Sequence, residues 1–318
     1  GVFMLLFTAS PSRFQELLTV FLQMQASMVQ PFNLVHGPLV YAALFQVAAN
    51  QWIFFYMVHH IISDGWSMNI LINELLLLYN ANVSGALSPL APLRIQYKDY
   101  SSWQQNQLTT GKFEKHKNYW LQQLRSPLPV LHFPYDQPRP AIITHHGRLV
   151  NRRINAKITE QLNAFCRKEE GTLFMGLLAA VNLLLYSYTG QEDLIVGTPI
   201  AGREHHALED QIGFYINTLA LRTAIKGADH FRTYFDHIKS LTLNAYEYQL
   251  YPFDELVNNL HIKQDPSRNV LFDAMLLLQN FDKIQENGYN MEGVNIKKYS
   301  GGEHVVSKYD ITFYFTEK

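Results

Sequence analysis

The sequence predicts an α/β protein of two lobes, in which strands and helices alternate along the chain. Short apolar runs typical of buried strands alternate with longer segments whose apolar residues recur at helical spacing. At 318 residues the chain is long enough to bury a large core in two lobes. Residues 126–144 contain five prolines and little periodicity, which predicts a linker. We therefore predict an N-terminal lobe over residues 1–138 and a C-terminal lobe over residues 139–318.

The expected elements follow from these patterns in chain order. In the N-terminal lobe, the sequence predicts strands over residues 1–8, 40–47 and 52–58, and helices over residues 11–30, 67–80, 97–103 and 113–124. In the C-terminal lobe, it predicts strands over residues 147–154, 194–197, 212–219, 274–279 and 311–315, and helices over residues 159–170, 173–188 and 231–248. Thr172 and Gly190 are the expected start and stop signals of the helix over residues 173–188.

Composition excludes several classes of protein. A formal net charge of −1 provides no field for holding nucleic acid or an anionic membrane. The single cysteine, Cys166, cannot form an internal disulfide, which fits a reducing compartment. No uninterrupted apolar run reaches the roughly 18 residues of a membrane-spanning helix. We therefore expect a soluble cytoplasmic protein.

The stretch most informative about function follows the predicted strand over residues 52–58. It reads His-His-Ile-Ile-Ser-Asp-Gly-Trp-Ser from His59 to Ser67. If the strand continues through the two histidines, they point to opposite faces, one toward the packing and one toward a cavity. Asp64 is close enough to fold back and fix the loop, Gly65 is expected at its crowded corner, and Ser67 is expected to cap the next helix.

This stretch resembles the His-His-x-x-x-Asp-Gly motif of nonribosomal peptide synthetase condensation domains, which belong to the chloramphenicol acetyltransferase-like superfamily. The longer string is similar to the subclass that joins an L-configured donor to an L-configured acceptor. Further family motifs are matched in order at residues 31–39, 97–103, 132–140, 199–203, 212–222, 249–254 and 265–271. Three positions depart from the family pattern: Asn33 replaces an acid, Tyr248 a histidine and Gln264 an arginine.

The resemblance implies two chloramphenicol-acetyltransferase-like lobes, each a mixed sheet flanked by helices, arranged as a V-shaped pseudo-dimer in which the N-terminal lobe is incomplete. It also implies a chain truncated at both ends, because family members begin with about seventy further residues. The implied reaction joins a carrier-bound donor acyl or peptidyl thioester to the α-amine of a carrier-bound acceptor aminoacyl thioester. The implied partners are donor and acceptor carrier domains and an adjacent adenylation domain. No cofactor is bound directly, because the carriers bring their own 4′-phosphopantetheine.

The resemblance also assigns roles to residues of the motif. His60 is the expected catalytic residue, either as a proton acceptor or as a hydrogen-bonding group that aligns the amine. The Gly65 backbone N–H is expected to stabilise a developing oxyanion. Asp64 and His59 are expected to be structural, and Arg203 is the candidate partner of Asp64 within the chain. The candidates for contacting substrate are Asn269, for which a loop-stabilising role is an equal alternative, Tyr215 and Trp66.

Three alternatives remain. A metal-dependent hydrolase is disfavoured because adjacent histidines on a strand diverge and no second cluster supplies a third ligand, so we expect no metal site. A stand-alone acyltransferase using coenzyme A is disfavoured by the synthetase-like later motifs. A docking module without activity is disfavoured because His60 and Asp64 are intact. The truncation implied by the resemblance nevertheless predicts that the isolated chain is unstable or inactive, even though its parent is an enzyme.

Overall fold

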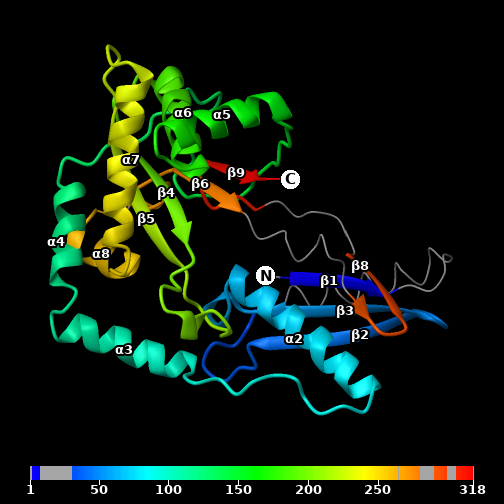
Figure 1. The fold of residues 1–318 in the computed structure, drawn as a ribbon. Coiled ribbons are helices and arrows are strands. Elements are labelled where there is room, and N and C mark those ends of the chain that lie inside the picture. Colours follow the sequence, from blue (N-terminus) through cyan, green and yellow to red (C-terminus); the bar gives the residue numbers. More distant parts are fainter. Residues whose placement is uncertain (1, 8–30, 264, 280–289, 299–305, 318) are drawn as a thin grey trace. The chain divides into compact units, whose positions relative to one another are not determined.

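The computed structural model describes residues 2–7, 31–263, 265–279, 290–298 and 306–317. The chain forms two compact units, which we describe separately (Figure 1). Unit 1 comprises Gly1–Trp103, Arg203–Tyr215 and Phe281–Glu303, whereas unit 2 comprises Gln104–Gly202, Ile216–Asn280 and His304–Lys318. The helix predicted over residues 11–30 lies outside the described residues.

Unit 1 contains a five-stranded sheet in the order β2-β3-β1-β8-β7. Its strands are β1 (Val2–Phe7), β2 (Val40–Ala48), β3 (Gln51–Val58), β7 (Asn290–Met291) and β8 (Val294–Lys298). Strands β2 and β3 form an antiparallel hairpin, and β1 pairs antiparallel with both β3 and β8. The three strands predicted in this part of the chain are confirmed, whereas β7 and β8 were not predicted.

Strand β3 is the strand of unit 1 that leads into the motif, and both of its faces are covered. Ile53, Phe55 and Met57 pack in one apolar cluster, and Tyr56 and Val58 pack in another. The second cluster includes Met68 and Ile72 of α2 (Gly65–Val83), so this helix covers one face of the sheet. Burial on both faces explains why the strand sequence is apolar throughout rather than alternating.

Unit 1 also includes the start of α3 (Tyr97–Thr109) and the segment Arg203–Tyr215. The boundary between the units falls within this helix. The segment Arg203–Tyr215 leaves unit 2 after β4 and packs in unit 1, and it contains a short 3₁₀ turn at His206–Leu208. The predicted strand over residues 212–219 is wrong at its start. The backbone is irregular over residues 212–216, and the strand begins only at Asn217.

Unit 2 contains a four-stranded sheet in the order β5-β4-β6-β9. The strands are β4 (Asp193–Ile200), β5 (Asn217–Ala224), β6 (Ala274–Gln279) and β9 (Ile311–Thr316). Pair β4–β5 is antiparallel, and pairs β4–β6 and β6–β9 are parallel, so the sheet is mixed as predicted. The helices of the unit are α4 (Glu114–Gln123), α5 (Ala156–Lys168), α6 (Leu173–Thr189), α7 (Phe231–Glu247) and α8 (Phe253–Leu260).

Helix α6 is the central helix of unit 2. It contacts α5, α7 and β6, and its buried side chains include Leu178 and Leu185. The predicted caps are confirmed: the Thr172 hydroxyl accepts from the Met175 N–H, and Gly190 ends the helix in the left-handed conformation at φ 68°. A buried helix without a polar face was therefore correctly delimited by its capping residues alone.

Two sequence predictions about this region are corrected. The boundary between residues 138 and 139 does not separate the units, because Trp120, Leu124 and Leu131 are buried in the core of unit 2. The segment 147–154 forms no strand and is exposed along its length, despite its apolar residues. Only His146, just before it, makes an isolated bridge, to Val306.

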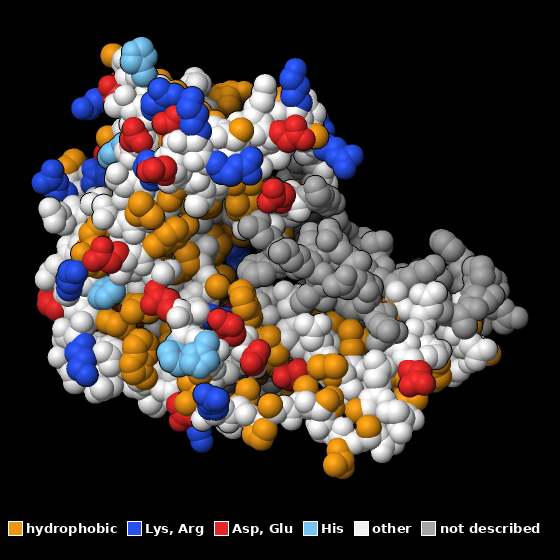
Figure 2. Space-filling view, in the orientation of Figure 1, with side chains coloured by type: hydrophobic (Ala, Val, Ile, Leu, Met, Phe, Trp, Pro, Cys, Tyr) orange, Lys and Arg blue, Asp and Glu red, His pale blue; other side chains and the backbone are white. Residues whose placement is uncertain are grey.

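On the face drawn in Figure 2, neither charged nor apolar side chains gather in a single dominant patch. Acidic and basic side chains are interspersed there over α5, α6 and α7. Among the described residues, no single helix is long and apolar enough to span a membrane, although the pair α5 and α6, bent by 109°, passes such a test by length and composition. Both of these helices contribute to the core of unit 2.

Candidate functional site

The two motif histidines lie in a tight turn directly after β3. The strand ends at Val58, and His60–Ile62 forms a 3₁₀ turn that His59 precedes. The His59 Nδ1 atom accepts from the Ile61 N–H at 3.1 Å, and the His60 Nδ1 atom lies 2.8 Å from the Ser63 carbonyl oxygen. The strand therefore does not continue through the two histidines, so the alternation of faces considered for a continuing strand does not apply to them.

These two contacts require opposite tautomers of the neutral rings. A carbonyl oxygen only accepts, so His60 must carry its proton on Nδ1, which leaves the Nε2 lone pair free. A backbone N–H only donates, so the Nδ1 atom of His59 must be unprotonated. Of the two imidazoles, His60 is thus the one whose basic nitrogen is not used by the turn.

The surroundings of the two rings also differ. His60 is exposed, and its ring centroid lies 5.4 Å from that of Phe214 in an edge arrangement. His59 is half-buried, packs edge-on against Phe32 at 5.5 Å, and its backbone N–H donates to the Leu39 carbonyl oxygen at 3.0 Å. His59 therefore supports the turn, whereas the His60 ring is exposed to solvent.

Asp64 links the histidine turn to α2. Its carboxylate accepts from the Ser67 backbone N–H at 2.8 Å and from the Ser67 hydroxyl at 2.7 Å. Asp64 is consequently the N-cap of α2, and the prediction that Ser67 caps this helix is wrong. Capping by a carboxylate also places a negative charge at the positive end of the helix dipole.

Arg203 forms a buried ion pair with this cap. Its Nη2 atom lies 3.2 Å from Asp64 Oδ1, and the two side chains are 1% and 3% exposed, respectively. The prediction that Arg203 is the partner of Asp64 is thus confirmed. The guanidinium also donates to the carbonyl oxygens of Leu208 and Gln211 and lies 4.1 Å from the ring centroid of Tyr215. Segment 203–215 thereby encloses the carboxylate of the motif within unit 1.

Ser67 connects the same segment to the helix start. Its fully buried hydroxyl oxygen accepts from Arg203 Nη2 at 2.8 Å and from the Gly213 backbone N–H at 3.0 Å. It also lies 2.9 Å from the Gly213 carbonyl oxygen, a second acceptor for its single proton besides Asp64. Sequence reasoning treated this serine as a helix cap only, because its partners lie about 140 residues further along the chain.

Tyr215 and Trp66 have supporting contacts in the structure. Tyr215 is 2% exposed, its N–H donates to Asp64 Oδ2 at 3.0 Å, and its hydroxyl donates to the Gln211 side chain. Burial raises its pKa to about 12. The expectation that Tyr215 contacts substrate does not fit this burial. The Trp66 indole N–H donates to the Glu209 carbonyl oxygen at 2.8 Å, while its half-buried ring remains partly accessible.

Two glycines of the site differ from each other in how crowded they are. Gly65 is exposed as the first residue of α2, and a Cβ there would meet no described atom within 4 Å, so its position is not the crowded corner that was predicted. Its N–H belongs to the first turn of the helix, where backbone N–H groups have no intrahelical acceptor. A Cβ on Gly213, in contrast, would clash with the Tyr97 ring and lie 2.8 Å from the Tyr215 ring. The close approach of segment 203–215 therefore requires a glycine at position 213.

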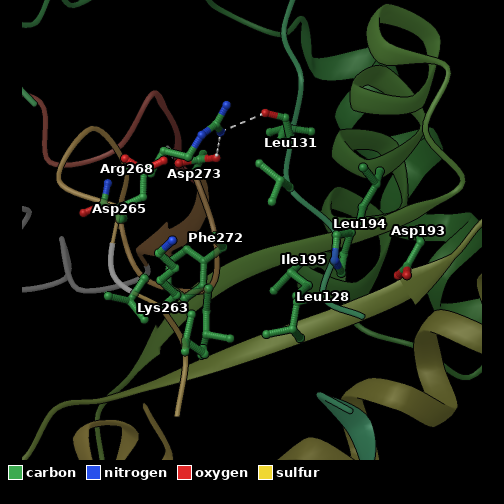
Figure 3. A pocket seen from close by; sticks show the side chains of 16 residues that line it. Leu128, Leu131, Asp193, Leu194, Ile195, Lys263, Asp265, Arg268, Phe272 and Asp273 are labelled. Carbon is green, nitrogen blue, oxygen red and sulfur yellow. Dashed lines mark hydrogen bonds and ion pairs between the residues drawn. The ribbon is translucent and has the colours of Figure 1, made fainter. Parts of the chain in front are cut away.

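Asn269 lies in unit 2, beside a cavity of about 290 Å³ (Figure 3). Figure 3 shows Arg268 reaching both the Leu131 carbonyl oxygen, at 3.0 Å, and the Asp273 carboxylate, at 2.5 Å. Burial raises the pKa of Asp273 despite this arginine. The Asn269 amide donates to the Lys308 carbonyl oxygen at 2.6 Å. This contact matches the loop-stabilising alternative considered for Asn269.

The titratable side chains of the site do not form a metal centre. Among residues that the structure describes, no group of three or more His, Cys, Asp or Glu side chains is placed to hold a metal ion. Asp64 already accepts from four donor groups and is enclosed by Arg203. The arrangement thus consists of one accessible imidazole on a turn that a buried polar network holds in place.

Comparison with known proteins identifies the family of this chain. The family model described as Condensation domain matches residues 13–318. The chain belongs to the condensation domain family. It is 40% identical over 286 residues to tyrocidine synthase 3 of Brevibacillus parabrevis, covering 90% of this chain and 4% of that protein. It is 40% identical over 290 residues to bacitracin synthase 3 of Bacillus licheniformis, covering 91% of this chain and 4% of that protein. This condensation domain therefore spans a small fraction of the curated relatives that it matches.

Solved structures show the same fold. A four-domain nonribosomal peptide synthetase bound to AMP and glycine matches with a TM-score of 0.80 at 20% identity, over 96% of this chain and 23% of that one. The X-domain from teicoplanin biosynthesis, in complex with OxyB, matches with a TM-score of 0.85 at 21% identity, over 98% of this chain and 67% of that one. The predicted mixed α/β class of the condensation domain is confirmed by these likenesses.

Proposed function

We propose that this condensation domain forms an amide bond between a donor acyl or peptidyl thioester and the α-amine of an acceptor aminoacyl thioester. The observation that carries the proposal is the 2.8 Å contact between His60 Nδ1 and the Ser63 carbonyl oxygen, which a neutral ring makes as a hydrogen bond only with its proton on Nδ1. The His60 Nδ1–H is held by the Ser63 carbonyl oxygen, so an exposed ring offers a free Nε2 acceptor. The relatives at 40% identity are synthases of tyrocidine and bacitracin, which supports the choice of an amine as nucleophile.

The reaction needs modest proton chemistry and close alignment. An α-ammonium group has a pKa of about 8, so about a tenth of it is neutral at pH 7. The neutral nitrogen attacks the thioester carbon, the C–N bond forms, and the C–S bond breaks to release a thiolate. Holding both substrates in reacting geometry supplies several kcal/mol through effective molarity.

His60 is the residue that we assign to the nitrogen. Its Nε2 lone pair accepts a hydrogen bond from the attacking amine and takes the proton that the nitrogen loses as the amide forms. The imidazolium then returns this proton to the thiolate or to solvent. Both the aligning role and the proton-accepting role require Nε2 to be unprotonated, and the Ser63 contact favours this state.

Other residues of the site act on the oxyanion or on the turn. We assign the Gly65 N–H, at the start of α2, to the thioester oxygen. The helix dipole and an N–H without an intrahelical acceptor both stabilise negative charge there. Asp64, Arg203 and His59 hold the turn that carries His60. Trp66 is retained as a substrate-contacting candidate, whereas Tyr215 supports the turn and Asn269 supports its own loop.

Carrier and adenylation domains are the partners of the proposed reaction. Donor and acceptor carrier domains bring the two thioesters on 4′-phosphopantetheine arms, and an adenylation domain loads the acceptor carrier. The donor and acceptor are both L-configured, following the resemblance of residues 59–67 to that subclass. The similarity to synthases of tyrocidine and bacitracin supports a cytoplasmic assembly line.

A transfer assay with two loaded carrier domains tests this function. We expect His60→Ala to lower the single-turnover rate by about 10²- to 10⁴-fold, the usual contribution of general acid–base catalysis. The matched control is His206→Ala, an exposed histidine of segment 203–215, which should leave the rate unchanged.

Three results would contradict the proposal. Transfer undiminished by His60→Ala removes the role of His60. Transfer from coenzyme A thioesters but not from carriers identifies a stand-alone acyltransferase instead. Carrier binding without any transfer by the unmodified protein identifies a docking module.

A further inference from the structure

Phe214 is the side chain that packs against the catalytic imidazole from outside its own turn. Their ring centroids are 5.4 Å apart with an interplanar angle of 78°. Phe214 is 37% exposed, so it packs against His60 while remaining accessible. Sequence reasoning gave Phe214 no role, because 154 positions along the chain separate it from His60.

The backbone on both sides of Phe214 is fixed to the start of α2. The Gly213 N–H donates to the Ser67 hydroxyl oxygen at 3.0 Å, and the Tyr215 N–H donates to Asp64 Oδ2 at 3.0 Å. The Phe214 carbonyl oxygen accepts from the Tyr97 hydroxyl at 3.0 Å. Helix α2 follows the histidine turn directly, so these bonds fix the backbone of Phe214 relative to that turn.

The His60 imidazole needs a contact besides its Nδ1 hydrogen bond to fix its orientation. His60 is exposed and has one fixed hydrogen bond, at Nδ1. An exposed side chain with a single anchor samples several rotamers, and each rotamer that turns Nε2 away from the substrate is unproductive. An aromatic ring packed against the imidazole restricts that sampling.

We propose that Phe214 is a positioning residue for His60, holding the imidazole in the rotamer that directs Nε2 at the acceptor amine. Phe214 acts through His60 and not through the buried network, because its own side chain makes none of the polar contacts of Asp64 or Ser67. The inference rests on the function proposed above for its kinetic consequence, but the ring contact itself is independent of that function.

The kinetic test compares Phe214→Leu, which keeps apolar volume and removes the ring, with Phe214→Tyr, which restores a ring. We expect Phe214→Leu to lower the single-turnover transfer rate by about two- to tenfold, the range of an aromatic pair contact, with the acceptor KM unchanged. Phe214→Tyr should recover the rate. Ile212→Ala, at a neighbouring 38% exposed position, is the control and should behave as wild type.

The spectroscopic test uses the 318-residue chain with labelled histidine and phenylalanine rings. The unmodified chain should show a nuclear Overhauser contact between the His60 and Phe214 rings. Phe214→Leu should shift the His60 ring resonances more than those of His59, through loss of the ring current. Resonances that do not move, or a Phe214→Leu variant that transfers at the wild-type rate, would overturn the proposal.

The two readouts separate this inference from the proposed function. If the unmodified domain forms no amide, the proposed function fails, and the ring resonances still decide whether Phe214 contacts His60. If Phe214→Leu does not fold, the Overhauser contact in the unmodified chain decides the same question. A KM increase with an unchanged rate at saturation assigns Phe214 to substrate binding and overturns the positioning role.

Discussion

The two adjacent histidines of the site differ in the backbone groups that their Nδ1 atoms contact. Their side chains are chemically identical, and the backbone groups that they meet make them different. A carbonyl oxygen at His60 and an N–H at His59 select opposite tautomers, so only one ring has a free basic nitrogen exposed. The motif specified both histidines, but their protonation sites follow from a turn of three residues.

Breaking the buried ion pair of Asp64 and Arg203 should strongly lower the stability of unit 1. Replacing Arg203 by Met leaves the Asp64 carboxylate buried without its countercharge, and breaking such a pair costs about 3–5 kcal/mol. We expect a decrease of this size in the free energy of unfolding, measured by urea denaturation. Loss of the bonds around Asp64 should also accelerate hydrogen exchange at the Tyr215 N–H.

The control for this prediction is an ion pair on the surface. Lys115 and Glu247 lie 3.2 Å apart with side chains 72% and 57% exposed. We expect Lys115→Met to change the free energy of unfolding by less than about 1 kcal/mol. Equal effects of Arg203→Met and Lys115→Met would contradict the importance assigned to burial.

At the scale of elements, segment 203–215 packs against the residues that follow the histidine turn. It has little regular structure, yet its charged and backbone groups provide partners for the Asp64 carboxylate and the Ser67 hydroxyl. The sequence identified its ends through family motifs at residues 199–203 and 212–222. It did not predict the contacts, because a loop without periodicity has no pattern from which its packing can be read.

Gly213→Ala should disrupt this element. A Cβ at position 213 would clash with the Tyr97 ring and lie 2.8 Å from the Tyr215 ring, so the segment must shift away from α2. We expect a loss of about 1–3 kcal/mol in the free energy of unfolding, as for other overpacked sites. Urea denaturation monitored by circular dichroism measures it.

The matched control is Gly65→Ala at the start of α2. Because no described atom lies within 4 Å of the added Cβ, we expect a change within about 0.5 kcal/mol. A loss at position 65 as large as the loss at position 213 would show that the backbone of the loop, and not crowding, explains the glycines.

At the scale of the whole molecule, the chain builds two cores that share no buried cluster among the described residues. The larger cluster belongs to unit 2, whereas two smaller clusters line the faces of β3 in unit 1. Each unit is assembled from three stretches of sequence. The two units are therefore interleaved along the chain even though each has its own interior.

Separate cores predict separate unfolding transitions. Leu178→Ala removes a fully buried side chain of unit 2 and should cost that unit about 2–5 kcal/mol. Trp120 reports on unit 2, and Trp52 reports on unit 1, so each can be followed by fluorescence in a variant that retains one tryptophan. We expect only the Trp120 transition to move to lower urea concentration.

The control for this experiment lies on the same helix. Leu184 of α6 is 44% exposed, and Leu184→Ala should leave both transitions within about 0.5 kcal/mol of wild type. A parallel shift of the Trp52 and Trp120 transitions in Leu178→Ala would show that the two units unfold as one cooperative body.

The sequence by itself determined the local structure and the chemistry available to this protein. An apolar run predicted β3, and apolar residues at helical spacing predicted most of the helices. Thr172 and Gly190 predicted the limits of α6, and the motif predicted His60 as the reactive residue. Each of these signals is written within a few neighbouring residues, where periodicity and capping preferences apply.

Only the tertiary structure decided which distant residues complete the site. The partnership of Ser67 with Gly213, the burial of Tyr215 and the contact of Phe214 with His60 join residues more than 140 positions apart. The segment over residues 147–154, with the composition of a strand, formed none because no neighbouring strand pairs with it in the part of the chain that is described. Long-range pairing is a property of the packed chain, and a local pattern does not encode it.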